Sequence, residues 1–251
     1  MEAYQDFALV YDTFMDNVPY EEWCEFLCNT LKKYEIENDL VLDLGCGTGT
    51  LTELLSKKGY DMIGVDNSAE MLNIAMKKKD ESGQSILYLC QDMREFELYG
   101  TVKAVICVCD SINYLLEEED LMETFSLVNN YLDPEGIFIF DFNTEYKYKE
   151  VIGDTTIAEN RDDCSFIWEN YYHEEEQINE YELTIFVKEE ELYRKFTETH
   201  YQRGYEKETV LACLKQAGLD ILEVMDGDTH GPAHDESERI CVIAREKGKK
   251  K

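Results

Sequence analysis

Between residues 40 and 142, short apolar segments alternate with amphipathic helical patterns, and this alternation restricts the possible folds more than any other feature of the sequence. The hydrophobicity of the apolar segments is nearly continuous, which indicates strands that are buried on both faces, as in a parallel sheet. Such an alternation predicts a doubly wound α/β fold with right-handed crossovers. Five strands are predicted there, at residues 40–44, 62–65, 85–90, 102–109 and 136–142.

The predicted helices between these strands begin and end at recognisable signals. One helix begins at Thr50, with Glu53 three residues later, which is the spacing of a capping box, and it ends before Gly59. A second helix follows Ser68, and a third spans the apolar residues from Leu121 to Val128. Near the C-terminus, one more helix and two strands complete a mostly parallel, seven-stranded Rossmann-like sheet. They are predicted at residues 207–217, 219–224 and 239–244.

Two segments depart from this alternation. Residues 1–35 carry apolar side chains at helical spacing and are predicted to form two amphipathic helices. Residues 150–205 alternate instead with period two, and the acidic run at 174–176 is predicted to be a turn. We therefore expect an inserted antiparallel β lid at 150–205, and a main domain that is made of residues 1–149 and 206–251.

The charge and cysteine content exclude several classes of partner. Asp and Glu total 55 against 24 Lys and Arg, a net charge of −31, which disfavours nucleic acid and anionic membranes. No apolar run approaches the roughly 18 residues of a membrane span, and the N-terminus does not have the pattern of a signal peptide. Nine cysteines without dense spacing suit a reducing compartment. We expect a cytoplasmic protein with a small-molecule partner, as a monomer or homodimer.

A glycine-rich turn follows the first predicted strand, where residues 43–50 are Asp-Leu-Gly-Cys-Gly-Thr-Gly-Thr. Glycines at alternate positions allow a tight bend and let the backbone approach a ligand closely. Free backbone N–H groups at the start of the next helix can serve a polar ligand. By itself, such a turn is also compatible with an ordinary strand–helix connection.

Three further strand ends carry polar groups at the same edge of the predicted sheet. Asp66 ends the second strand and can accept hydrogen bonds from both hydroxyls of a ribose. Residues 91–93 offer a carboxylate and backbone groups for an adenine edge, and polar residues at 109–114 follow the fourth strand. Because ligands of open α/β sheets bind at this edge, the four strand ends together predict a nucleoside pocket.

At these residues, the sequence resembles the class I S-adenosylmethionine (SAM)-dependent methyltransferases, over about residues 35–145 and the closing helix and strand pair. The glycine stretch lacks the extra spacer of the dinucleotide motif, which disfavours a nicotinamide-dependent oxidoreductase. The resemblance implies SAM as the methyl donor and S-adenosylhomocysteine as the product. It also implies a set of cofactor-binding residues: Asp43, Gly45, Cys46, Gly47, Gly49, Asp66, Asn67, Met71, Gln91, Asp92, Met93, Cys109, Asp110 and Ser111.

The same resemblance implies a role for most of these residues. Asp43 and the glycine turn would surround the methionine part of SAM, and Asp66 would bind the ribose. Asn67 and Met71 would lie beside the adenosine. Asp92 and Met93 would contact the adenine amino group and ring, whereas Asp110 and Ser111 would lie at the methionine end, facing the substrate.

Residues 11–23 also resemble the opening of a bacterial group of small-molecule methyltransferases. Related N-methyltransferases place a tyrosine of an N-terminal helix over the cofactor, which implies that Tyr4 and Tyr11 close the pocket. Packing between helix and sheet is an equally good explanation for both tyrosines.

The acceptor is expected between the strand ends and the lid, and five residues are candidates to contact it: Tyr114, Asn143, Trp168, His200 and Arg203. Methyl transfer from a sulfonium needs mainly alignment and exclusion of water, so a universal catalytic residue is not expected. His200, which can accept a proton near neutral pH, Asp110 and Tyr11 are the catalytic candidates. His230 and His234 are separated by Gly-Pro and are predicted to lie in a solvated loop, so we expect no metal.

These observations predict SAM-dependent methyl transfer to a small-molecule amine, carboxylate or hydroxyl. The loop at 110–113, Asp-Ser-Ile-Asn, lacks the prolines that enzymes methylating amino groups of nucleic-acid bases carry there. Two alternatives stay open: a non-catalytic regulatory protein that binds SAM or S-adenosylhomocysteine, and a methyltransferase that acts on RNA or protein.

Overall fold

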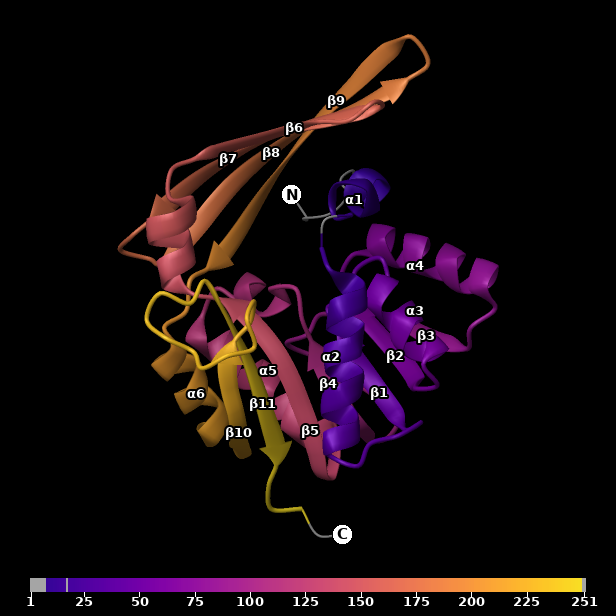
Figure 1. Ribbon diagram of the computed structural model, residues 1–251, viewed down its shortest axis with the longest axis vertical. Coiled ribbons are helices and arrows are strands. Elements are labelled where there is room, and N and C mark those ends of the chain that lie inside the picture. The colour runs from indigo at the N-terminus through magenta and orange to yellow at the C-terminus, as the bar shows by residue number, and fades with distance from the viewer. Residues whose placement is uncertain (1–7, 17, 250–251) are drawn as a thin grey trace.

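A seven-stranded sheet forms the centre of the computed structural model, which describes residues 8–16 and 18–249. The strand order is β10-β11-β5-β4-β1-β2-β3, and β11 alone runs antiparallel to its neighbours (Figure 1). The predicted doubly wound sheet is therefore confirmed. Its strands are β1 (Leu40–Leu44), β2 (Asp61–Asp66), β3 (Ile86–Cys90), β4 (Val102–Cys107), β5 (Leu132–Asn143), β10 (Leu219–Asp226) and β11 (Arg239–Glu246).

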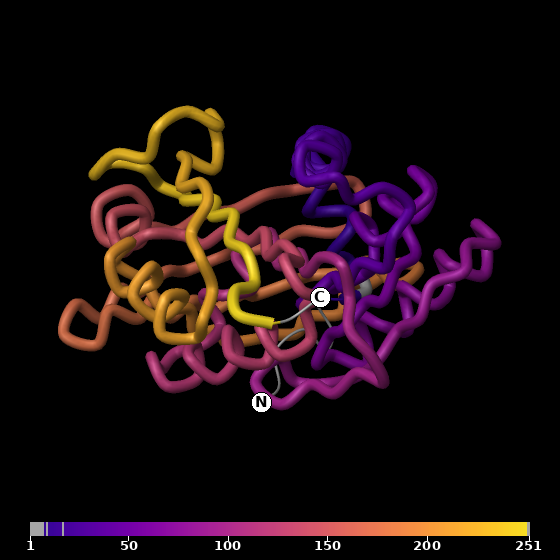
Figure 2. The backbone as a smooth tube through the Cα atoms, turned by 90° about the horizontal axis from the view of Figure 1, so that it is seen from below, coloured from indigo at the N-terminus to yellow at the C-terminus, as the bar shows by residue number. Residues whose placement is uncertain are grey.

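Helices cover both faces of this sheet, which explains why its strands are apolar on both sides. Leu42 and Val105 belong to the core under α5 and α6, whereas their neighbours Val41 and Ile106 belong to the core under α2 and α3. The helices are α1 (Ala8–Phe14), α2 (Tyr20–Lys33), α3 (Thr50–Lys57), α4 (Ala69–Ser82), α5 (Glu118–Tyr131) and α6 (Lys207–Gln216). Seen from below, α2 and the loop between β10 and β11 lie on the same face (Figure 2). There the rings of Phe26 and His230 stack, with centroids 4.3 Å apart.

The insert forms a separate antiparallel sheet in the order β6-β7-β8-β9, which stands above the carboxyl ends of the parallel strands (Figure 1). Its strands are β6 (Thr156–Asn160), β7 (Cys164–His173), β8 (Ile178–Glu189) and β9 (Leu192–Arg203). One face packs on α1, where the rings of Phe14 and Phe166 meet edge to face at 4.7 Å. Asp16 accepts two hydrogen bonds of 2.8 Å from the guanidinium of Arg161. The helix α1 is thereby attached to the lid.

Several local predictions differ from the structure, including the start of β5, which lies at Leu132 and not at residue 136. The capping box at Thr50 is wrong, because Gly49 caps α3 in the left-handed conformation, with a φ of 71° and no side-chain hydrogen bond. Ser68, by contrast, caps α4 and accepts a hydrogen bond from the Met71 N–H. Strand β4 ends at Cys107, earlier than predicted, because the backbone turns through positive φ angles before the 3₁₀ helix η1 (Ser111–Tyr114).

A π-helix, η2 (Lys147–Ile152), leads from β5 into the lid. Within the described ranges 8–16 and 18–249, no helix combines the length and the apolar character that a membrane span requires.

Candidate functional site

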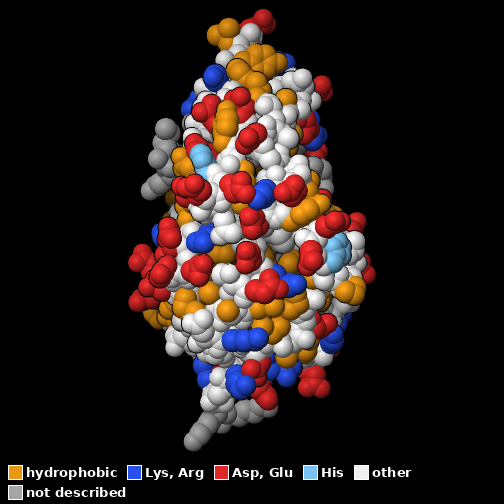
Figure 3. All heavy atoms as spheres, turned by 90° about the vertical axis from the view of Figure 1, so that its left-hand side faces the viewer, with side chains coloured by type: hydrophobic (Ala, Val, Ile, Leu, Met, Phe, Trp, Pro, Cys, Tyr) orange, Lys and Arg blue, Asp and Glu red, His pale blue; other side chains and the backbone are white. Residues whose placement is uncertain are grey.

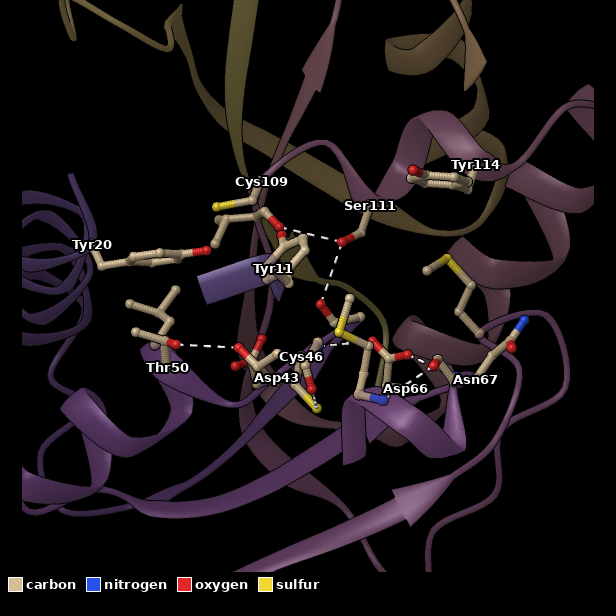
Figure 4. Close-up of a pocket in the computed structure, with 18 residues that line it drawn as sticks. Tyr11, Tyr20, Asp43, Cys46, Thr50, Asp66, Asn67, Cys109, Ser111 and Tyr114 are labelled. Atoms are coloured by element: carbon tan, nitrogen blue, oxygen red, sulfur yellow. Dashed lines mark hydrogen bonds between the residues drawn. The ribbon is translucent and has the colours of Figure 1, made fainter. Parts of the chain in front are cut away.

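A cavity of about 250 Å³ lies at the carboxyl edge of the sheet, between the turn after β1, the N-terminal helices and η1 (Figure 4). The predicted nucleoside pocket and this cavity share most of their residues. Twelve predicted residues line it: Tyr11, Asp43, Gly45, Cys46, Gly47, Asp66, Asn67, Met71, Met93, Cys109, Ser111 and Tyr114. Gly49, Gln91, Asp92 and Asp110 lie outside this lining, and Tyr4 lies outside the described residues.

The three glycines of the turn are needed for three different reasons, although all have positive φ angles. A Cβ on Gly45 would lie 2.6 Å from the hydroxyl of Ser111, so this glycine lets η1 approach the turn. A Cβ on Gly49 would overlap the hydroxyl of Tyr88. A Cβ on Gly47 would meet nothing within 4 Å, because this residue borders the open cavity. Gly47 is therefore the glycine whose missing side chain leaves room for a ligand.

Asp66 ends β2 at the cavity wall and also holds the turn in place. One carboxylate oxygen accepts the Gly47 N–H at 2.8 Å, and the other accepts the Ser68 N–H at 2.8 Å. Burial raises the pKa of this carboxyl, although the backbone hydrogen bonds favour its ionised form. Each oxygen of an ionised carboxylate can accept more than one hydrogen bond, so a carboxylate in the cavity lining suits a ligand with adjacent hydroxyls.

Asp43 supplies a second carboxyl group, at the bottom of the cavity. It is 3% exposed and accepts a hydrogen bond of 2.6 Å from the Thr52 hydroxyl. Burial raises its pKa to about 7, and the Thr52 hydrogen bond opposes that shift. A cation beside this carboxyl would favour its ionised form, so the position suits a positively charged group.

Tyr11 and Tyr20 flank one side of the cavity, and Tyr114 lies on another side (Figure 4). Cys109 also faces it, but burial and the nearby Asp141 raise the pKa of its thiol. Because a thiolate is the nucleophilic form of cysteine, this environment does not activate Cys109.

Several residues that the sequence analysis missed complete the site. Tyr20, Thr48 and Thr50 line the cavity. Thr48 and Thr50 stand next to predicted residues of the glycine turn, and Tyr20 lies within the segment 11–23 that carries the N-terminal resemblance. The Thr48 hydroxyl donates to Asp12 at 2.7 Å, and Lys78 pairs with the same carboxylate at 2.6 Å. These contacts attach α1 to the glycine turn.

The strand-end residues outside the cavity have protein partners instead. Asp92 pairs with Arg94 at 2.7 Å, and hydrogen bonding from this guanidinium lowers the pKa of the carboxyl. Gln91 accepts the backbone N–H of Glu97. Asp110 pairs with Arg239 at 3.0 Å and accepts a hydrogen bond of 2.8 Å from Gln202 of the lid. The sequence cannot show these partners, because Arg239 lies 129 residues away from Asp110.

Three of the predicted substrate residues come together beneath the lid. The Tyr114 hydroxyl lies 3.1 Å from Nδ1 of His200 and 2.7 Å from the Tyr181 hydroxyl. Trp168 packs against the Tyr181 ring at 4.8 Å and donates from its indole nitrogen to Asn170 at 2.9 Å. His200 is 1% exposed and does not line the cavity itself. Tyr114 therefore lies between His200 and the cavity.

The other two predicted substrate residues lie apart from this group. Arg203 donates to the backbone carbonyl of Leu116 at 2.9 Å. Asn143 is buried and donates to the Tyr148 hydroxyl at 3.0 Å, while Lys147 donates to its side-chain oxygen. Both residues connect the lid or its hinge helix to the sheet.

Comparison with known proteins identifies the kind of site. The family described as "Methyltransferase domain" matches residues 41–136. The chain is 39% identical to the protein named "Putative methyltransferase YqeM" from Bacillus subtilis, over 96% of each sequence. It also resembles the crystal structure of an S-adenosylmethionine-dependent methyltransferase from Clostridium acetobutylicum. The TM-score is 0.89 and the identity 32%, over 98% of this chain and 100% of that one. A more distant relative, 30% identical over 54% of this chain and 56% of its own length, is the dTDP-3-amino-3,4,6-trideoxy-alpha-D-glucopyranose N,N-dimethyltransferase of Streptomyces venezuelae.

Proposed function

Because the chain belongs to the SAM-dependent methyltransferases, we propose that it transfers the methyl group of SAM to a small molecule bearing an amine, carboxylate or hydroxyl. The observation that carries this proposal is the cavity at the sheet edge, with two carboxyl groups at its wall and a lid above it. We assign residues 150–205 as the substrate-capping lid.

The donor set of the cavity fits SAM. Asp66 would accept hydrogen bonds from the ribose hydroxyls, and Asp43 would face the cationic amino group of the methionine part. Met71 and Met93 supply apolar surface for the adenine ring. Bound SAM supplies a methyl group on a sulfonium with a good leaving group. The chain's own residues then have to align the acceptor and exclude water.

Three observations favour a small acceptor over RNA or protein. The lid and α1 cover the carboxyl edge of the sheet. Acidic side chains are spread over the face shown in Figure 3, and the net charge of −31 disfavours a polyanion. The name of the Streptomyces relative describes an enzyme for a nucleotide-linked amino sugar.

The test is transfer of labelled methyl groups from SAM to a cell extract that has been separated into metabolite, RNA and protein fractions. We expect label in the metabolite fraction and binding of SAM without binding of NAD. Label confined to RNA or protein would contradict a small acceptor. Binding of SAM with no transfer to any fraction would favour a regulatory role.

The pKa of Asp43 predicts that SAM binding depends on pH. With a pKa of about 7, this carboxyl is mostly protonated at pH 6 in the free protein, and a bound cation would favour ionisation. SAM binding should therefore release a proton, and its affinity should increase from pH 5 to pH 7 and then level off. Calorimetry in buffers of different ionisation enthalpy measures the released proton. Asp43→Asn should reduce both effects, leaving the part that comes from Asp66, and an unchanged pH dependence in that variant would contradict the assignment.

A further inference from the structure

A chain of polar contacts runs from the cavity wall into the lid. Tyr114 lines the cavity from η1, and its hydroxyl lies 3.1 Å from Nδ1 of His200 on β9. On the other side of the ring, Nε2 of His200 lies 3.3 Å from the Glu198 carboxylate, which is ion-pair distance without hydrogen-bond geometry. The side chain of His200 is fully buried and that of Glu198 is 7% exposed. The order from cavity to interior is thus phenol, imidazole and carboxylate.

The lid holds this imidazole in one orientation. Tyr181 and His200 are register partners of the antiparallel pair β8–β9. Their rings stack with centroids 4.9 Å apart and planes 7° from parallel. Such cross-strand pairs fix the ring plane through packing. The Tyr181 hydroxyl also lies 2.7 Å from the Tyr114 hydroxyl, so the same residue orients both partners.

The chemical properties of Glu198 and Tyr114, on either side of His200, indicate which nitrogen of the imidazole carries the proton. The negative charge of a carboxylate 3.3 Å from Nε2 favours the tautomer of His200 that carries its proton on that nitrogen. Nδ1 then accepts a hydrogen bond, and the Tyr114 hydroxyl is positioned to donate it. In this arrangement, Tyr114 can pass its proton inward and take another from the cavity side.

We propose that Tyr114 removes the proton which the acceptor loses on methylation, and that His200 and Glu198 receive the resulting positive charge. Tyr114 is the catalytic residue of this group, whereas His200 and Glu198 are positioning residues that act through it. The inference rests on the proposed function, because it concerns the acceptor of the same site.

The step balances in atoms and charge. A lone pair of the acceptor nitrogen or oxygen forms a bond to the methyl carbon, while the carbon–sulfur bond breaks and its electron pair stays on sulfur. The acceptor's proton moves to the oxygen of Tyr114 as the tyrosine's own proton moves to Nδ1 of His200. The positive charge lost by the sulfonium is then carried by the imidazolium, opposite the Glu198 carboxylate.

This assignment narrows the class of acceptor. A hydroxyl or an amine loses a proton when it is methylated, whereas an ionised carboxylate has none to lose. A base at the cavity wall would serve no purpose for a carboxylate acceptor. We therefore infer that the product is an ether or an N-methylamine and not a methyl ester.

Tyr114→Phe tests the catalytic residue, with the labelled-SAM assay and the metabolite extract as the source of acceptor. The rate of transfer at pH 7 should fall by about 100-fold, the scale of general base catalysis, while the dissociation constant of SAM changes less than about twofold. Tyr201→Phe is the matched control. It lies next to His200 on β9, is 44% exposed and donates to Glu180, so the rate should stay unchanged.

A pH profile separates a base from a structural tyrosine. If the acceptor is a hydroxyl, hydroxide must remove its proton when the base is absent, so the rate of Tyr114→Phe should increase about tenfold per pH unit between pH 7 and pH 9. Among the described residues, the titratable groups in contact with His200 include Tyr114 from η1, Tyr181 from β8 and Glu198 from β9. With a hydroxyl acceptor, a profile parallel to that of the wild type, at a uniformly lower rate, would overturn the proposal; with an amine acceptor, a wild-type rate in Tyr114→Phe at a pH above the pKa of the amine would overturn it.

Glu198→Gln gives a second variant that conserves size. It should slow transfer at least about tenfold with unchanged SAM affinity, because the imidazolium loses its paired charge. His200→Gln should slow transfer as much as Tyr114→Phe does. Wild-type rates in both variants would overturn the relay even if Tyr114→Phe failed to fold.

The product itself distinguishes this inference from the proposed function. Mild alkali hydrolyses a methyl ester and releases labelled methanol, whereas ethers and N-methylamines retain the label. Retention of the label in the metabolite fraction is the expected result. Released methanol would overturn the inference and leave the methyltransferase intact, whereas the absence of any labelled metabolite would count against the proposed function.

Discussion

Gly47→Val is expected to abolish SAM binding while the protein stays folded. Gly47 borders the cavity, and a Cβ at this position meets nothing within 4 Å, so the valine would fit but would occupy the ligand's space. Titration calorimetry should detect no binding at SAM concentrations that saturate the wild type. Wild-type affinity in this variant would reject the assignment of the turn.

Backbone strain at Gly47 needs its own control, because its φ is +54°. Gly83 offers a close match: its φ is +69°, nothing lies within 4 Å of its Cβ position, and it caps the far end of α4. Gly83→Val should cost about 1–2 kcal/mol of stability, the usual penalty for a left-handed non-glycine residue, and should bind SAM normally. Thermal unfolding of both variants measures the shared strain. The difference in their SAM affinity then isolates the steric effect.

Asp66→Ala is expected to weaken SAM binding by about 10- to 100-fold, or about 1.5–3 kcal/mol, the scale of a hydrogen bond to a charged group. The carboxylate faces the cavity from the end of β2. Asp61→Ala, at the exposed start of the same strand, should bind SAM as the wild type does. An unchanged dissociation constant in Asp66→Ala would contradict its role in ribose binding.

The same variant also removes the acceptor for two backbone N–H groups of the turn, those of Gly47 and Ser68. Competition by adenosine and by 2′,3′-dideoxyadenosine separates the two effects. If Asp66 binds the ribose, the substitution should weaken adenosine more than the dideoxy analogue. Equal weakening of both would show that the carboxylate acts only by holding the turn.

The fold could be predicted from the sequence because its main signals are local. Strands β1 and β4 are apolar on both faces since each face has its own layer of helices. The lid strands alternate with period two because one of their faces packs on α1 or the sheet edge. The prediction of a capping box at Thr50 was wrong because Gly49, with a positive φ, is the N-cap of α3. The capping-box pattern specifies residue types at two positions and carries no information on the backbone conformation of the residue before them.

Most of the cavity residues that could be predicted lie at the end of a strand or in the turn that follows it. Asp43 and Asp66 lie in the last residues of β1 and β2, and both line the cavity. Asp92 and Asp110 have the same sequence signature but face Arg94 and Arg239, and the second of these partners lies on a strand at the other end of the chain. The contact between Tyr114 and His200 joins residues 86 positions apart, so no spacing in the sequence could reveal it.

The attachments of α1 differ in kind at its two sides. Ring packing between Phe14 and Phe166 joins the helix to the lid together with the Asp16–Arg161 ion pair, whereas Asp12 is held through polar contacts with Lys78 and Thr48. Dissolved ions screen the ion pairs on both sides and leave the ring packing with the lid almost unaffected. In an open form of the enzyme, α1 would therefore travel with the lid, and Tyr11 would leave the cavity together with a segment about 150 residues further along the chain.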